Sequence, residues 1–75
     1  MIIKILGSGC RRCVALADNA TAAAQAAGKE AQIVKVTDMA EIAAYGVMST
    51  PGLVIDERLV STGKVLTPSE IAPLL

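Results

Sequence analysis

The chain has only two cysteines, Cys10 and Cys13, with two arginines between them. A short apolar segment precedes this motif and an alanine-rich segment follows it. In a helix that begins at or just before Cys10, residues three apart share a face, and their Cα atoms come within the roughly 4.4–6.8 Å that a disulfide requires. The first sulfur then lies beside unpaired backbone N–H groups at the positive helix end, which favours the thiolate. The motif therefore predicts a redox-active dithiol.

Other uses of a cysteine pair remain open at this point. The two thiols could be inert core residues, a static disulfide or metal ligands. A static disulfide that closes so small a loop constrains the unfolded chain little. Structural zinc needs four ligands, and the chain has no histidine, whereas two thiolates suit a two-coordinate soft ion such as Cu(I). Redox chemistry is favoured because the pair lies at a strand-to-helix turn.

Composition and charge exclude several classes of function. With 75 residues we expect a single domain over residues 1–75. Seven basic and seven acidic residues cancel, and Tyr45 is the only aromatic residue, so we expect no nucleic-acid partner. No apolar run approaches the roughly 20 residues of a membrane span, and the N-terminal residues lack the basic segment of a secretory leader. We expect no membrane association and a reducing, cytoplasmic setting, where a lone CxxC is typically catalytic.

Hydrophobic patterning predicts strands and helices in alternation. Strands are predicted at 2–6, 33–36, 53–55 and 58–61, and helices at about 10–27, at 38–45 and from 67 onward. Asp56 and Glu57 join the last two strands as a hairpin, although Glu57 must then adopt a positive φ. The order β-α-β-α-β-β-α predicts an α/β fold, a three-layer α/β/α sandwich around a four-stranded mixed sheet. Its first two strands are expected to be parallel and its last two antiparallel.

The predicted helices carry recognisable faces and ends. The inner stripe of the first helix is predicted to contain Cys13, Leu16, Ala17, Ala20, Ala24 and Ala27. Gly28 is predicted to end that helix. Asp38 with Glu41, and Thr67 with Glu70, are each predicted to form a capping box at the start of a helix. Pro73 limits the regularity of the last helix.

These features together resemble the thioredoxin/glutaredoxin superfamily, and most of all its minimal members of about this length. The resemblance covers nearly the whole chain. It rests on the first strand, on Gly-Ser-Gly-Cys-Arg-Arg-Cys, on the Gly46–Pro51 loop before an apolar strand, and on the terminal hairpin and helix. The chain departs from the usual Trp-Cys-Gly-Pro-Cys of thioredoxins, because it has no tryptophan and Arg11-Arg12 replaces Gly-Pro.

The resemblance implies thiol–disulfide exchange with disulfides of partner proteins. Cys10 would attack the substrate disulfide, and Cys13 would then attack Cys10 and release the reduced substrate. Arg11 and Arg12 are expected to lower the pKa of Cys10 by proximity. The resemblance also implies no cofactor beyond the redox-active disulfide, and an upstream reductant of the thioredoxin-reductase or glutathione type. We expect a monomer.

Thr50 and Pro51 are expected to form the substrate-binding loop. The resemblance implies a cis peptide bond between them that faces the disulfide. Pro51 has no backbone N–H, so the backbone of Thr50 is free to bond an extended substrate strand. Tyr45 and Met48 are expected to pack in the core or loop rather than form a docking surface. Lys4, the only charged residue of the first strand, is expected to direct its amino group outward.

Two alternatives to an oxidoreductase stay open. One is a thiol protein that binds a soft metal or arsenic through Cys10 and Cys13. The other is a binding module that keeps the fold without turnover. Larger thioredoxins carry a buried acid that helps to deprotonate the second thiol, and the chain has no evident counterpart. Water is then the expected proton acceptor for Cys13.

Overall fold

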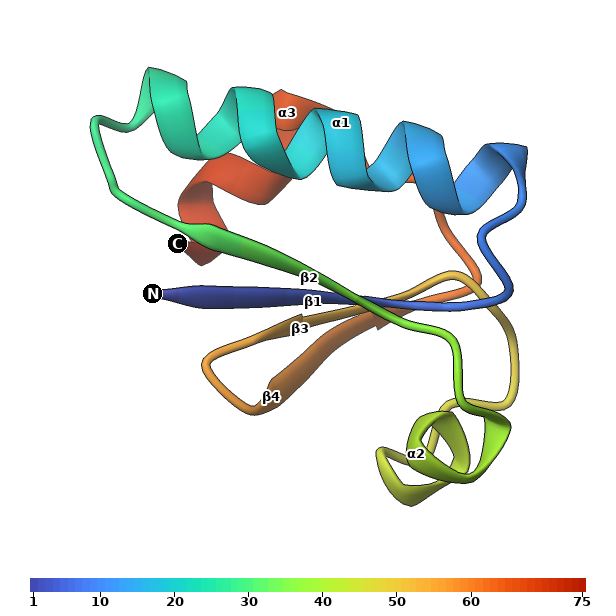
Figure 1. Ribbon diagram of the computed structural model, residues 1–75. Helices are drawn as coiled ribbons and strands as arrows, with labels where there is room; N and C mark the ends of the chain where they lie inside the picture. Colours follow the sequence, from blue (N-terminus) through green and yellow to red (C-terminus); the bar gives the residue numbers. More distant parts are fainter.

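A computed structural model describes residues 1–75, and its elements follow the predicted order (Figure 1). They are β1 (Ile2–Leu6), α1 (Arg11–Ala26), β2 (Gln32–Val36), α2 (Met39–Ala44), β3 (Gly52–Ile55), β4 (Arg58–Thr62), α3 (Pro68–Ile71) and a final 3₁₀ turn, η1 (Ala72–Leu74). Every predicted strand and helix is confirmed. Pro73 lies in the 3₁₀ turn, where the last helix loses its α-helical geometry as expected.

The four strands form one mixed sheet in the order β2-β1-β3-β4. β1 runs parallel to β2 and antiparallel to β3, and β3 and β4 form an antiparallel hairpin. The hairpin turn has φ values of 47° at Asp56 and 68° at Glu57, as the two-residue loop requires. The mixed sheet is therefore confirmed, with the two most apolar strands at its centre.

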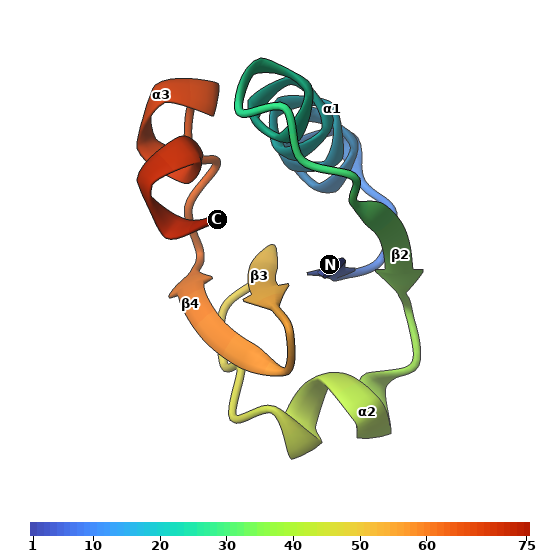
Figure 2. The same cartoon turned by 90° about the vertical axis from the view of Figure 1, so that its left-hand side faces the viewer.

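Helices cover both faces of the sheet and make the three predicted layers. Figure 2 shows α1 and α3 over one face and α2 over the other. Alternate residues of each strand point to opposite faces. Ile3 and Ile5 pack with α1 and α3, whereas Leu6 and Val54 pack with Ile42 of α2. The sheet thus separates a larger core on the α1 side from a smaller one on the α2 side.

The alanine-rich helix α1 packs closely over the sheet because its inner face carries almost no bulk. Its buried residues are Cys13, Leu16, Ala17, Ala20, Ala23 and Ala24. The prediction for Ala27 is wrong, since this exposed residue caps the C-terminus where the chain turns away. Ala23, which the predicted stripe omitted, is fully buried in its place. Gly28 follows with φ 67° and ends the helix as predicted.

The capping predictions are confirmed in one helix and half confirmed in the other. At α3 the Thr67 hydroxyl accepts from the Glu70 N–H and the Glu70 carboxylate accepts from the Thr67 N–H. At α2 the Asp38 carboxylate accepts from the N–H groups of Ala40 and Glu41, but the Glu41 side chain does not return a bond. Asp38 alone satisfies this helix start.

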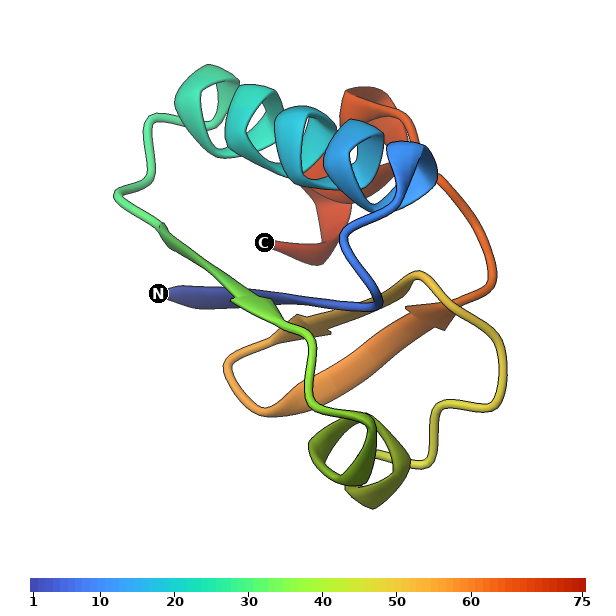
Figure 3. The same cartoon turned by 45° about the vertical axis from the view of Figure 1, so that its right-hand side comes forward.

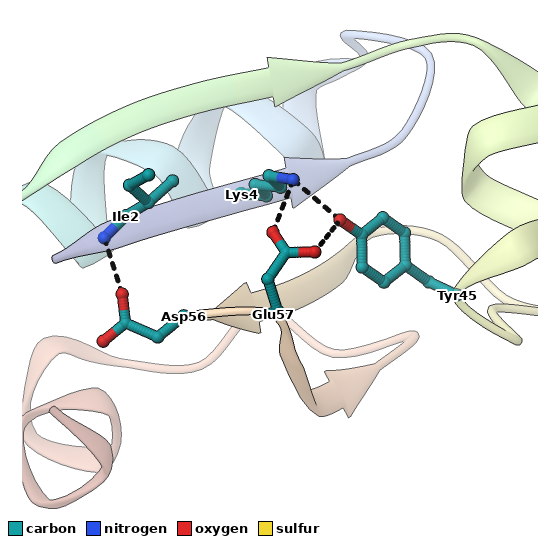
Figure 4. Close-up of polar contacts among 5 residues, drawn as sticks. All are labelled: Ile2, Lys4, Tyr45, Asp56 and Glu57. Atoms are coloured by element: carbon teal, nitrogen blue, oxygen red, sulfur yellow. Dashed lines mark hydrogen bonds and ion pairs between the residues drawn. The ribbon is translucent and has the colours of Figure 1, made fainter.

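Lys4 directs its amino group outward as predicted, but this group is not free in solvent. Its ammonium lies on the α2 face of the sheet, 2.6 Å from a carboxylate oxygen of Glu57 and 2.7 Å from the hydroxyl of Tyr45 (Figure 4). The Tyr45 hydroxyl in turn donates to Glu57 at 3.0 Å. The hydrogen bonds to Glu57 and Tyr45 raise the pKa of Lys4, and the bond from Lys4 lowers the pKa of Glu57.

This polar cluster fixes the end of α2. Tyr45 is the C-cap residue of α2 and packs partly buried against the smaller core, which confirms its predicted packing role. The loop that begins at Gly46 therefore starts from an anchored point. In Figure 3 this loop, the turn before α1 and the connection after β4 lie toward one end of the sheet. The two cysteines are at that end.

Candidate active site

The two thiols meet at the N-terminus of α1, and their exposures differ. Cys10 is the N-cap residue and is exposed, whereas Cys13 in the first turn is only 4% exposed. Both are free thiols, and their Sγ atoms lie 3.2 Å apart. A disulfide bond is about 2.05 Å long, so the sulfurs need to approach by only about 1.2 Å to form one. An external disulfide can reach Cys10 more easily than Cys13.

Hydrogen bonds to its sulfur lower the pKa of Cys10 to about 7. The largest contribution is the backbone N–H of Cys13, followed by the Cys13 side chain, with smaller bonds from the Arg12 N–H and the Ser8 hydroxyl. These are the donors expected at a helix start, where backbone N–H groups lack intrahelical partners. Near neutral pH about half of Cys10 is therefore thiolate, the nucleophilic form.

The burial of Cys13 depends on Gly7, the residue that follows β1. A Cβ atom on Gly7 would overlap the Sγ atom of Cys13 and would lie 3.5 Å from the Cβ of Thr50. Any side chain at position 7 would therefore occupy the space of the buried sulfur. The N–H of Gly7 donates to the carbonyl of Val36 at 2.9 Å, so the backbone of Gly7 is itself held in place.

Thr50 and Pro51 lie beside this thiol pair. The peptide bond between them is cis, Pro51 is buried and Thr50 is exposed. The carbonyl of Pro51 accepts from the N–H of Gly63 at 2.9 Å, whereas Thr50 makes no backbone hydrogen bond. The polar backbone groups of Thr50 are thus available to another chain.

The two arginines of the motif have different surroundings. The Arg12 guanidinium donates through Nη2 to the carbonyl of Gly63 at 2.7 Å, which ties the first turn of α1 to the connection after β4. The Arg11 side chain is exposed and makes no hydrogen bond or ion pair; the one salt bridge of the chain joins Lys4 and Glu57. Of the two arginines, only Arg12 contributes to the lowered pKa of Cys10, and it does so through its backbone N–H. Tuning of this pKa by the guanidinium charges therefore stays a prediction.

Comparison with known proteins agrees with this geometry. The family model described as "Thioredoxin domain" matches residues 1–75. A thioredoxin of Methanocaldococcus jannaschii is 41% identical over 71 residues, which cover 95% of this chain and 81% of that protein. A thioredoxin of Methanothermobacter thermautotrophicus is 36% identical over 75 residues, which cover 100% of this chain and 97% of that protein.

The chain belongs to the thioredoxin family. Thioredoxins are thiol–disulfide oxidoreductases, and Cys10 and Cys13 supply the two thiols that this activity needs. The structure places all the predicted site residues of this thioredoxin-family chain at one end of the sheet: the cysteines and arginines on the first turn of α1, and Thr50 with Pro51 just before β3.

Sequence reasoning missed three contributors to this thioredoxin site and misplaced a fourth residue. No role at the site was predicted for Gly7, Ser8 and Gly63. Gly7 leaves room for Cys13, the Gly63 carbonyl accepts from Arg12, and Ser8 donates to the sulfur of Cys10. No local signal could have paired Gly63 with Arg12, since 51 residues separate them. The packing role predicted for Met48 is wrong, because its side chain is 98% exposed.

Two further observations concern metal binding and the membrane. No three or more His, Cys, Asp or Glu side chains come together as a metal site. No helix is both long and apolar enough to cross a bilayer.

Proposed function

We propose that the protein reduces disulfides in partner proteins, with Cys10 as the attacking thiolate and Cys13 as the resolving thiol. The thiolate of Cys10 attacks one sulfur of the substrate disulfide, a Cys10–substrate bond forms, and the other substrate sulfur leaves as a thiolate. Cys13 then loses its proton to water and attacks Cys10, which releases the second substrate thiolate. Two electrons pass to the substrate, and the two protons of the dithiol are balanced by those that the product thiols take up.

The observation that carries this proposal is the unequal exposure of two sulfurs 3.2 Å apart. The exposed sulfur with a pKa of about 7 suits the first attack, because about half of it is thiolate at neutral pH and it is accessible. The buried sulfur suits the second attack, because it already lies against its target. An order with Cys13 first would require a bulky substrate to reach a side chain that is 4% exposed.

Thr50 and Pro51 are proposed to hold the substrate segment next to Cys10. The unpaired backbone of Thr50 can bond an extended chain, and the missing N–H of Pro51 prevents the loop from continuing as a paired strand there. Arg11 and Arg12 are proposed to stabilise the Cys10 thiolate further through their charge. Their exposure limits this contribution, since solvent and salt screen surface charges.

The proposed partners follow from the chemistry. Each turnover leaves a Cys10–Cys13 disulfide, so an upstream reductant of the thioredoxin-reductase or glutathione type must supply two electrons. No other cofactor takes part in the proposed cycle. We infer that the protein is a monomer. We also infer that it works in the reducing cytoplasm, because an isolated CxxC pair stays available as a dithiol in such a compartment.

Reduction of insulin in the presence of dithiothreitol tests the proposal. The wild-type protein should accelerate insulin precipitation and Cys10→Ser should not. Cys13→Ser should accumulate a mixed disulfide with a substrate peptide, detectable by mass spectrometry. Activity that survives in Cys10→Ser, or mixed disulfides trapped through Cys13 in that variant, would overturn the assigned roles. A glutathione redox titration of the wild type would measure the reduction potential of the Cys10–Cys13 pair. Mass spectrometry would monitor the titration through the loss of two hydrogens.

A further inference from the structure

The surface beside Cys10 contains a segment without internal partners. Met48, Ser49 and Thr50 are all exposed and make no backbone hydrogen bonds. This segment lies between the cysteine turn and the connection after β4, because a Cβ on Gly7 would lie 3.5 Å from Thr50 and a Cβ on Gly63 would lie 3.1 Å from Ser49. A bound chain that pairs with this segment therefore passes between those two neighbours.

Arg12 reaches across the same place. Its guanidinium starts on α1 and ends 2.7 Å from the carbonyl of Gly63, next to the loop that carries Ser49 and Thr50. A guanidinium has five N–H donors, and only Nη2 is used here, so the group can still bind a carboxylate. The tether holds the side chain in place, which lowers the entropy that it loses when a ligand binds.

The two arginines at this end have no carboxylate partner within ion-pair distance. Arg11 and Arg12 are exposed and form no ion pair, and the first turn of α1 contains no acidic residue. Asp38 uses its carboxylate to cap α2, and Asp18 lies seven residues along α1 from Arg11, about 10 Å away at 1.5 Å per residue.

We propose that the partner of this site is an extended protein segment in which acidic residues flank the disulfide cysteine. Its backbone pairs with Met48–Thr50 while its carboxylates bind Arg11 and Arg12. This inference rests on the proposed disulfide reduction and adds the substrate class. Opposite charges at such a rim raise the association rate and select among partners more than they raise affinity.

Three substrates test the proposal. Two are disulfide-bonded peptides that differ only in the residues flanking the cysteine, glutamate in one and lysine in the other. The third is oxidised glutathione, which is acidic but has no extended flanking segment. At low ionic strength the wild-type kcat/KM for the glutamate peptide should exceed that for the lysine peptide by about tenfold. The ratio should fall toward one at 1 M salt, where the screening length is about 3 Å.

Three variants locate the charge. Each variant is judged by the ratio of its kcat/KM for the glutamate peptide to that for the lysine peptide. A change in the reactivity of Cys10 affects both values equally and cancels in this ratio. Arg11→Glu should bring the ratio below one, and Arg12→Gln should reduce it several-fold while its amide can still donate to Gly63. Arg58→Glu removes the same charge from the opposite end of the sheet and should leave the ratio unchanged.

Each outcome decides between the possibilities. Equal wild-type rates for the two peptides, or a preference that persists in Arg11→Glu and Arg12→Gln, overturn the acidic partner and leave disulfide reduction intact. A rate for oxidised glutathione equal to that for the glutamate peptide overturns the assignment to a protein segment. Failure of the wild type to reduce any of the three substrates overturns the proposed function itself.

Discussion

The lowered pKa of Cys10 predicts how its reactivity changes with pH. The perturbation is a pH titration of the reduced protein against iodoacetamide. In the folded protein the pKa is about 7, and in the urea-unfolded protein the same thiol should return to about 8.5. The unfolded chain therefore serves as the matched reference, since it contains the same sulfur without the hydrogen bonds from Cys13, Arg12 and Ser8.

The expected size of the effect follows from two opposing factors. At pH 7 the folded thiol is about half ionised and the reference about 3% ionised, a ratio of about 16. A thiolate of lower pKa is a weaker nucleophile, and a Brønsted slope of about 0.4–0.5 over 1.5 pH units reduces the rate about 4–6-fold. Cys10 should therefore react about 3–4-fold faster than the unfolded thiol at pH 7. Above pH 9.5, where both are ionised, it should react about 4–6-fold more slowly.

Mass spectrometry of tryptic peptides reads the two cysteines separately. The rate for Cys10 should rise with an inflection near 7, and Cys13 should stay unmodified while the protein is folded. Cys13→Ala removes one of the bonded groups and keeps the backbone N–H, so the inflection should move up without reaching 8.5. An inflection of the wild type at 8.5, or equal alkylation of both cysteines, would refute the account of the site.

The remaining predictions concern packing, capping and linkage. Gly7→Ala should cost about 1–3 kcal/mol of unfolding free energy by overpacking and should make Cys13 reactive to iodoacetamide. Gly52→Ala adds the same methyl against Val47 instead, at 3.0 Å, and should leave Cys13 protected; protection in both variants would show that Gly7 is not what shelters the thiol. Thr67→Ala should cost about 1 kcal/mol through the lost capping box, whereas Ser69→Ala in the same helix should change the urea midpoint little, and equal effects would contradict the capping argument.

The pKa of Cys10 also predicts how stability depends on pH. A pKa that is lower in the folded than in the unfolded protein favours the folded state at pH values above the unfolded pKa, and this gain is lost as the pH falls through about 7. The free energy of unfolding of the reduced protein, relative to Cys10→Ser, should therefore increase between pH 7 and pH 9. Urea denaturation with a phosphine reductant measures this difference, and a flat difference would argue against a lowered pKa.

Local patterns in the sequence were sufficient for the secondary structure and the chemical motif. Strand and helix ends shift by at most one residue from those predicted, because glycine, proline and the capping residues act on their immediate neighbours. The same locality explains why Cys10 could be placed at a helix start. The burial of Cys13 was predicted from its place on the inner stripe of that helix, and the structure confirms it. The exposure of Cys10 was not predicted, because it depends on how the N-cap residue sits against the rest of the fold.

Contacts between distant segments lay beyond such reasoning. Lys4 points outward as expected, but its partners were not predicted: Tyr45 and Glu57, distant in the sequence, converge on its ammonium. Met48 was expected to pack, yet its loop leaves it in solvent. In each case the local sequence is compatible with both outcomes, and the decision depends on which segment happens to lie nearby.

The amino-acid sequence by itself determined the alternation of strands and helices, the dithiol at a helix start and the proline before an apolar strand. These depend on backbone preferences and hydrophobic period, which act over a few residues. Only the tertiary structure decided the strand order, the space that Gly7 leaves for the sulfur of Cys13, and the bond from Arg12 to Gly63. Those features depend on packing across the sheet, where close-packed atoms from remote segments must share one volume.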